Sequence, residues 1–171
     1  LYYKDNGYTN TIKYLKEYDK LYILKSMTKF YSSAGIRVGT IASSKNNIEK
    51  LRKFEPMWKL SQFDSNDLQA ALDDKSFKGI SKAINVKNKL ELEKILQSSI
   101  LVEHIYQSSA NYLLVKLKNL TAKQFQERLK PFKIMVRNCA NFDFLDESYV
   151  RIAVKSSSAN ETLKKALEQI C

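Results

Sequence analysis

The stretch that decides the fold is residues 26–39, Ser-Met-Thr-Lys-Phe-Tyr-Ser-Ser-Ala-Gly-Ile-Arg-Val-Gly. It is polar and contains two glycines, and it follows an apolar stretch, Leu21–Leu24, that predicts a short strand. A second strand is predicted over Ile36–Ala42. Functional side chains often lie on loops that a rigid sheet positions. The sequence therefore predicts a functional loop at the edge of a sheet.

Four side chains of this loop occur at a fixed spacing. Ser26 lies three residues before Lys29, and Thr28 comes directly before it. Arg37 follows Lys29 by eight residues and has a glycine two residues away on each side. This pattern resembles the cofactor-attachment signature of the class I/II aminotransferases, which use pyridoxal phosphate (PLP). One departure is Ser33, where that family usually has an apolar residue.

The resemblance implies a role for each of these residues. Lys29 would carry PLP and act as the catalytic amine, since a lysine amine can both attach a carbonyl compound and transfer a proton. Ser26 and Arg37 would bind the phosphate dianion, which needs hydroxyl donors and a fork-shaped cation, and Thr28 is a further hydroxyl candidate. The alternative is that Lys29 is a solvated loop lysine and Arg37 a charge at a strand edge. The combined spacing favours the cofactor-binding role.

The residues around and after this loop, up to about residue 99, follow a mostly helical pattern. A helical flank is predicted over Asn10–Tyr18. A helix begins at Ser44 and is ended by Pro56. Two further helices are predicted over Asn66–Ala83 and Lys87–Gln97. The apolar face of the helix that follows Ser44 consists of Ile48, Leu51 and Phe54.

The C-terminal part alternates between strands and helices. Strands are predicted over Ala110–Leu117, Ile134–Arg137 and Tyr149–Val154. A capping box of Thr121 and Gln124 predicts a helix to Leu129, and a second box of Ser158 and Glu161 predicts the start of the last helix. The apolar face of that last helix consists of Leu163, Leu167 and Ile170. The predicted order, β-α-β-β-α, suits a small α+β domain.

Two arginines stand out in a chain whose 29 basic residues are mostly lysine. Arg137 opens an Arg-x-Cys-Ala-Asn element, and Arg151 follows it by 14 residues. This stretch resembles the small domain of the same family, in the subgroup that contains histidinol-phosphate aminotransferase and L-threonine-O-3-phosphate decarboxylase. The resemblance implies that Arg151 binds the substrate α-carboxylate and that Arg137 meets the substrate phosphate or carboxylate. The alternative for Arg151 is a surface charge on an amphipathic strand, and we expect Cys139 to pack beside Arg137.

The resemblance also implies the architecture, an α/β chain of fold type I. Residues 1–99 would be the C-terminal part of the PLP-binding large domain, with its αβα layers and connecting helices, and residues 100–171 the small α+β domain. The expected function is transamination or decarboxylation of an amino acid, in particular a phosphorylated one, by a full-length homodimer. The decarboxylase named above is an alternative. A piece that lacks the N-terminal half of the family is expected to be inactive alone.

Composition limits the other classes of function. With 44% apolar residues the chain can bury a core, and no apolar run reaches the length of a membrane span. The two cysteines, Cys139 and Cys171, and the single histidine, His104, predict neither a disulfide framework nor a metal site, and favour the cytoplasm. The net charge of +11 keeps a basic nucleic-acid-binding domain as the non-enzyme alternative. The scattered lysines argue against nucleic acid as a partner.

Overall fold

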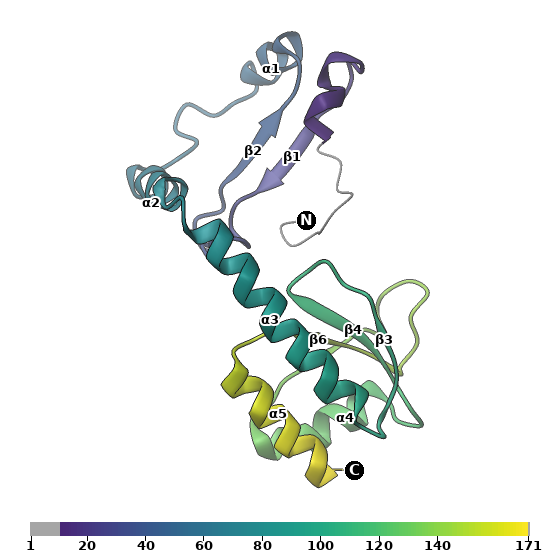
Figure 1. Ribbon diagram of the computed structural model, residues 1–171. Helices are drawn as coiled ribbons and strands as arrows, with labels where there is room; N and C mark the ends of the chain where they lie inside the picture. The colour runs from purple at the N-terminus through teal and green to yellow at the C-terminus, as the bar shows by residue number, and fades with distance from the viewer. Residues whose placement is uncertain (1–10, 171) are drawn as a thin grey trace. The chain divides into compact units, whose positions relative to one another are not determined.

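The computed structural model describes residues 11–170, and Figure 1 shows its helices and strands. Two positions named above, Asn10 and Cys171, lie outside the described residues. The described chain divides into two compact units, residues 11–77 and residues 78–170. It contains both helices and strands, in agreement with the predicted α/β fold class. No helix in the described range is long and apolar enough to cross a membrane.

The first unit is built on a two-stranded antiparallel hairpin. Its strands are β1 (Ile23–Ser26) and β2 (Gly39–Ala42). A short 3-10 helix, η1 (Thr11–Lys16), precedes the hairpin, where a longer helical flank was predicted. Two helices follow the hairpin, α1 (Lys45–Arg52) and α2 (Gln62–Asp73). The strand, loop and strand order predicted around the loop is therefore confirmed.

The strand boundaries differ from the prediction because of one backbone conformation. Arg37 has a φ of 55°, in the left-handed region, which extended backbone does not include. The second strand therefore begins at Gly39, after Arg37, and the first strand continues to Ser26, opposite Gly39. Sequence periodicity reports which residues are apolar, but it does not report a single residue with positive φ.

The helices that follow begin at capping residues. The Ser44 side chain accepts a hydrogen bond from the Asn47 backbone N–H, so α1 begins where it was predicted. It ends at Arg52, however, and Phe54 lies outside it with 86% of its surface exposed. The assignment of Phe54 to the apolar face of this helix was wrong.

The helix break between the two predicted helices lies earlier than expected. The Asp74 carboxylate accepts hydrogen bonds from the backbone N–H groups of Ser76 and Phe77, both at 3.0 Å. An acidic side chain that binds the first N–H groups of a helix favours a helix start at this point. Helix α3 (Phe77–Gln97) therefore runs unbroken through the gap that the sequence had suggested near Ala83.

The second unit contains a four-stranded antiparallel sheet in the order β3-β4-β6-β5. The strands, in chain order, are β3 (Val102–Tyr106), β4 (Tyr112–Leu117), β5 (Arg137–Asn138) and β6 (Tyr149–Ala153). Strand β3 was not predicted. Its two consecutive polar residues, Glu103 and His104, interrupt the alternation, and the pairing with β4 shifts at this point in a bulge.

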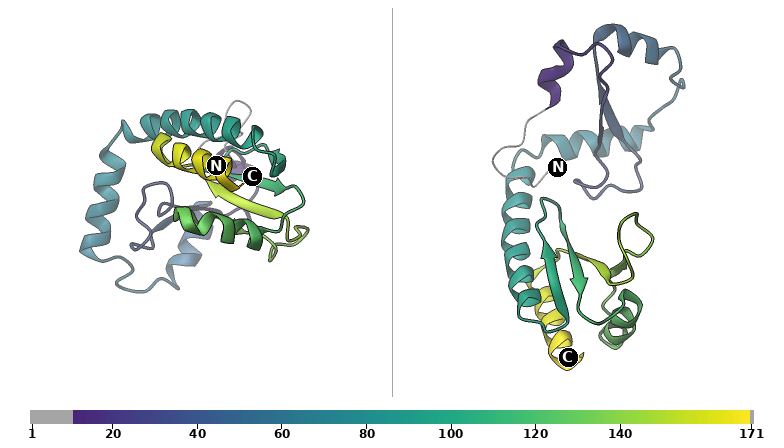
Figure 2. Two further views of the ribbon diagram at one scale, coloured as in Figure 1. Left: turned by 90° about the horizontal axis from the view of Figure 1, so that it is seen from below. Right: turned by 90° about the vertical axis from the view of Figure 1, so that its right-hand side faces the viewer.

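Three helices cover one face of this sheet. They are α3, α4 (Ala122–Leu129) and α5 (Ser157–Ile170), and Figure 2 shows α3 and α5 side by side. The capping box of Thr121 and Gln124 is confirmed. The second predicted box is wrong, because α5 begins at Ser157 and the Ser156 hydroxyl accepts from the Ala159 N–H.

The core of the second unit lies between the helices and the sheet. Its buried side chains alternate along β4 and β6, which leaves the intervening residues on the opposite face. The apolar face predicted for the last helix packs there. The main members are Leu92, Leu96, Leu113, Val115, Leu117, Phe125, Leu129, Val150, Ile152, Leu163 and Leu167.

Candidate functional site

The loop that carries Lys29 is held by buried residues on both sides of it. Met27, Thr28 and Phe30 are buried, and the Met27 N–H donates to the Val38 carbonyl at 3.2 Å. Lys29 itself is exposed. The neighbours of Lys29 thus fix the backbone while its amine projects from the surface. This is the arrangement that a covalently attached cofactor needs, because the attachment point must be both accessible and fixed.

Two of the predicted phosphate ligands are already hydrogen-bonded to each other. The Ser26 and Thr28 hydroxyl groups lie 3.0 Å apart. They line one open hollow together with Arg37 and Gly39. The structure therefore brings together around one hollow three residues, Ser26, Thr28 and Arg37, that lie up to eleven residues apart in sequence. Such a set offers the donors that a phosphate dianion requires.

Gly39 allows the two sides of this hollow to approach closely. A Cβ atom on Gly39 would lie 3.0 Å from the Lys25 carbonyl oxygen, which is closer than nine in ten real Cβ contacts. Arg37, two residues earlier, donates from Nη1 to the Ala34 carbonyl at 3.0 Å. This contact and its left-handed backbone fix the arginine in a tight turn.

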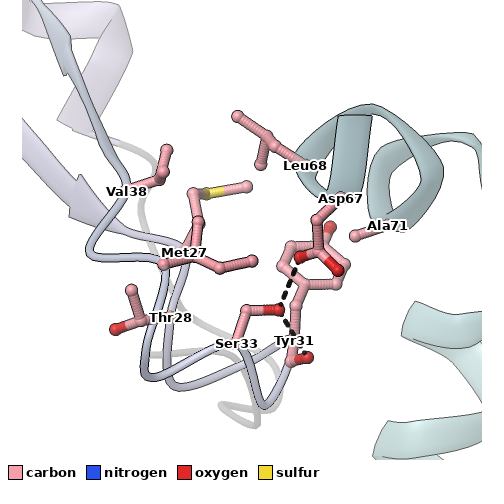
Figure 3. A pocket seen from close by; sticks show the side chains of 9 residues that line it. Met27, Thr28, Tyr31, Ser33, Val38, Asp67, Leu68 and Ala71 are labelled. Atoms are coloured by element: carbon pink, nitrogen blue, oxygen red, sulfur yellow. Dashed lines mark hydrogen bonds between the residues drawn. The ribbon is translucent and has the colours of Figure 1, made fainter. Parts of the chain in front are cut away.

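The loop is also tied to α2. Figure 3 shows the Ser33 hydroxyl donating to Asp67 Oδ2, at 3.0 Å, and to the Tyr31 carbonyl, at 3.2 Å. A small pocket lies between this part of the loop and α2, with Leu68 and Ala71 on its far side. Ser33 was noted as a departure from the family pattern. Its single O–H is shared between these two acceptors, so the departure leaves no unsatisfied donor.

Two aromatic residues of the loop pack against the ring of Phe77. Phe30 meets Phe77 edge to face with ring centroids 5.5 Å apart, and Tyr31 stacks on the same ring at 5.6 Å. Aromatic pairs at these separations are favourable beyond their buried area. The Lys29 loop is therefore anchored to the start of α3 as well as to α2.

Arg137 and Arg151 are direct neighbours in the second unit. They occupy paired positions on β5 and β6, so both side chains lie on the sheet face opposite the core. The strand pattern permitted either face for Arg151, and the structure decides it, because Val150 and Ile152 are buried and Arg151 is not. Sequence spacing alone did not show that the two arginines are paired across neighbouring strands.

Each guanidinium has neutral neighbours. The Arg151 guanidinium carbon lies 4.7 Å from the centre of the Tyr112 ring. The Arg137 guanidinium carbon lies 5.8 Å from the Phe142 ring, and its Nη2 donates to Asn141 Oδ1 at 2.9 Å. Within residues 11–170 neither arginine forms a salt bridge. Two like charges opposite each other on adjacent strands are unfavourable, so an anion bound between them would relieve this repulsion.

Cys139 packs beside this pair, as expected. Its thiol donates toward the Arg137 carbonyl at 3.6 Å and is buried. Burial raises the pKa of the Cys139 thiol, and the charges of Arg151 and Arg137 only partly oppose this. A thiol with a raised pKa stays protonated at neutral pH and is a poor nucleophile. Cys139 is therefore a packing residue.

The sequence assigned no role to several residues that lie beside the predicted site residues in the structure. Asn141 and Phe142 hold Arg137, and Asp67 holds the Lys29 loop. The pair Tyr106 and Tyr149 lies on the same sheet face as Arg151. The alternation along β6 could have placed Tyr149 beside Arg151, but the contacts with Asp67 and Tyr106 depend on chain segments distant in sequence.

Comparison with known proteins identifies relatives of this chain. The chain is 32% identical over 154 residues to the histidinol-phosphate aminotransferase of Methanocaldococcus jannaschii, covering 90% of this chain and 41% of that protein. It is 28% identical over 164 residues to the threonine-phosphate decarboxylase of Salmonella typhimurium, covering 95% of this chain and 44% of that protein. The chain thus spans less than half the length of these curated relatives.

A solved structure shows the same fold. The crystal structure of histidinol-phosphate aminotransferase from Sinorhizobium meliloti, in complex with pyridoxal-5'-phosphate, superposes with a TM-score of 0.79 at 20% identity. The match covers 93% of this chain and 43% of that one. Residues 1–170 match the family described as aminotransferase class I and II. This chain belongs to the class I and II aminotransferase family.

Proposed function

We propose that this chain is the cofactor-attaching half of a PLP enzyme that transaminates or decarboxylates a phosphorylated amino acid. The observation that carries the proposal is the shared hollow lined by Ser26, Thr28 and Arg37, with exposed Lys29 on the adjoining loop. The relatives named above act on a phosphorylated amino alcohol or amino acid, which supports the substrate class.

The residues of the hollow fit the phosphate of PLP. The Ser26 and Thr28 hydroxyls can each turn to donate to an anionic oxygen, and Arg37 adds a charged fork. Gly39 leaves the hollow without a side chain at its closest point. Bound PLP supplies an electron sink for the bond that breaks at the substrate Cα. Lys29 would attach the cofactor and then transfer the proton at that carbon.

The arginine pair would bind the anionic groups of the substrate. A bidentate guanidinium orients a carboxylate more firmly than a lysine does, because it fixes two oxygens at once. Arg151 is held by Tyr112 and Arg137 by Asn141, so both are positioned before an anion arrives. The orientation of the α-carboxylate would then decide whether a proton or carbon dioxide leaves the substrate Cα.

The complete activity belongs to a longer protein in this proposal. The chain covers 41–44% of the curated relatives, and the N-terminal half of the family would complete the cofactor site. We therefore expect this chain alone to be catalytically silent, and the parent protein to be a homodimeric enzyme of the cytoplasm. The proposed domains remain residues 1–99, the end of the large domain, and residues 100–171, the small domain.

The attachment of PLP can be tested directly. The parent protein is incubated with PLP, reduced with borohydride and digested, and its peptides are mapped by mass spectrometry. We expect the modification on the peptide with Lys29, and none there in a Lys29→Ala variant. Lys45→Ala is a matched control, because Lys45 is a fully exposed lysine of the same unit. Modification spread over exposed lysines, with Lys29 not preferred, would contradict the proposal.

The two reactions are separated by their products. Transamination of O-phosphoserine or histidinol phosphate requires a 2-oxo acid acceptor and consumes it in equal amount. Decarboxylation of O-phosphothreonine releases carbon dioxide without an acceptor. Arg151→Lys should reduce kcat/KM by about 10-fold or more for a substrate with an α-carboxylate, since charge remains but the bidentate contact is lost. An unchanged kcat/KM would remove Arg151 from the substrate site.

A further inference from the structure

The face of the four-stranded sheet opposite its core contains a second polar group beside the arginine pair. The alternation that buries Val150 and Ile152 places Tyr149 and Arg151 together on this face. Tyr106 reaches the same face from β3, on the other side of the central strand β4. The register pairs Tyr106 with Leu114, and Leu114 with Arg151. One row of side chains therefore crosses the sheet from Tyr106 to Arg151, with Leu114 between them.

The hydroxyl groups of Tyr106 and Tyr149 are hydrogen-bonded to each other on this face of the sheet. The two phenol oxygens lie 3.2 Å apart, and the ring centroids 6.0 Å apart. His104 packs its ring edge to face against Tyr106 at 4.5 Å, which supports the ring from the side. A pair of phenols that meet from strands separated by a third strand forms a defined group rather than two unrelated surface residues.

The two phenols have one hydrogen-bond donor more than their mutual hydrogen bond uses. Each phenol has one O–H donor, and one of the two is used between them. Within residues 11–170 the structure shows no other hydrogen bond from either hydroxyl. The hydrogen bond with Tyr106 raises the pKa of Tyr149, and burial adds to this effect, so the phenol remains a donor at neutral pH. One O–H is thus left for an acceptor from outside the unit.

The pair lies within reach of a molecule bound to Arg151. Tyr149 precedes Arg151 by two residues on the same face, which corresponds to about 7 Å along a strand. Tyr106 lies two strands away from Arg151, which corresponds to about 10 Å across the sheet. The other cation near Tyr149 is Lys116, and Glu103 already binds it at 2.7 Å. Within residues 11–170, neither of the two arginines and neither of the two phenols is bound to a carboxylate, so these four groups can receive an anionic small molecule.

We propose that Tyr106 and Tyr149 form a specificity-determining part of the substrate site, in which the spare O–H donates to an anionic oxygen at the far end of a substrate whose carboxylate lies on Arg151. This inference rests on the proposed function. The recognised chemistry is a second anionic group, either a phosphate ester or a side-chain carboxylate. Leu114, between the two anchoring points, offers an apolar floor for the carbon chain that joins the two groups.

The shared proton gives this proposal a distinctive signature. Removal of one hydroxyl, in Tyr106→Phe or Tyr149→Phe, frees the O–H of the other phenol. Each single variant should therefore raise KM for O-phosphothreonine by less than about 3-fold, because one donor remains. The double variant loses the last donor to a charged group and should raise KM by about 10-fold or more, with kcat little changed.

The test uses the parent protein and paired substrates. KM and kcat are measured for O-phosphothreonine, glutamate and threonine, with Tyr22→Phe as a control that deletes an exposed hydroxyl in the other unit. A loss confined to O-phosphothreonine identifies a phosphate ester, and a loss confined to glutamate identifies a carboxylate. The proposal would be overturned if the double variant raised KM for threonine by the same factor. It would also be overturned if a single variant raised KM for O-phosphothreonine as much as the double variant does.

A binding measurement separates this inference from the proposed function. The affinity of the parent protein for O-phosphothreonine is measured by isothermal titration calorimetry, which requires no turnover. Wild-type protein that binds the ligand about 10-fold more tightly than the double variant supports the phenol pair even if Lys29 takes no cofactor. If the two proteins bind O-phosphothreonine equally well and Lys29 carries PLP, the specificity role of the phenol pair is refuted. The proposed PLP-dependent function would still stand.

Discussion

Phe144 allows a stability prediction that can be worked out from its backbone alone. It has a φ of 66° and its side chain is fully exposed, at 104%. A left-handed conformation costs an L-residue about 1–2 kcal/mol, and glycine avoids this cost. Glycine also loses more entropy on folding, by about 0.5–1 kcal/mol. Because no buried surface is lost, Phe144→Gly should stabilise the second unit by about 0.5–1 kcal/mol.

Urea unfolding of the wild type and three variants tests this value. Phe144→Ala removes the ring but keeps the left-handed cost, so its free energy of unfolding should equal that of the wild type. Met135→Gly is the control for glycine itself, because Met135 is 95% exposed and has no positive φ. It should destabilise the unit by about 0.5–1 kcal/mol. If Phe144→Gly destabilises as much as Met135→Gly, the reasoning is refuted.

Three further predictions concern packing and pH. Gly39→Ala should destabilise the first unit by about 1–3 kcal/mol, because the added Cβ would lie 3.0 Å from the Lys25 carbonyl oxygen. Gly35→Ala is the control in thermal unfolding and should leave stability unchanged, because its Cβ would meet no atom within 4 Å. Leu96→Ala, at a fully buried position, should cost about 2–5 kcal/mol in urea unfolding. The hydrogen bond from Asn160 lowers the pKa of Glu91 below its ordinary value of 4.5. A lowered folded-state pKa adds stability that is present above pH 4.5 and lost as the pH falls through the folded value. Glu91→Gln should therefore flatten the acid limb of a plot of unfolding free energy against pH, and an unchanged limb would contradict this.

Local signals in the sequence predicted the elements whose stability is local. The box of Thr121 and Gln124 marks the start of α4, because both hydrogen bonds form between residues three apart. The alternation along β4 and β6 is similarly readable, since one face of each strand is buried. At the start of α5 three serines follow one another, and each can cap a helix. The sequence could not distinguish Ser156, which does so, from Ser158.

The geometry of the sites depends on pairing that the sequence does not encode locally. The spacing of Ser26, Thr28 and Arg37 indicated a phosphate site, but the positive φ of Arg37 was not visible in it. The neighbouring positions of Arg137 and Arg151 depend on the register of β5 against β6. Register is set by turns and by the pattern of buried residues across strands, so single-strand patterns do not reveal it. The assignment of substrate roles to these arginines remains a prediction.

The shortness of β5 affects how copies of this protein behave in a crowded solution. An exposed edge strand is a template on which another chain can add a strand. Strand β5 offers two residues for such pairing, and one of them is a charged arginine. The opposite edge, β3, contains the bulge near Glu103, which disrupts the ladder. Both edges of the sheet therefore disfavour edge-to-edge aggregation, and the charge of Arg137 contributes to this at the β5 edge.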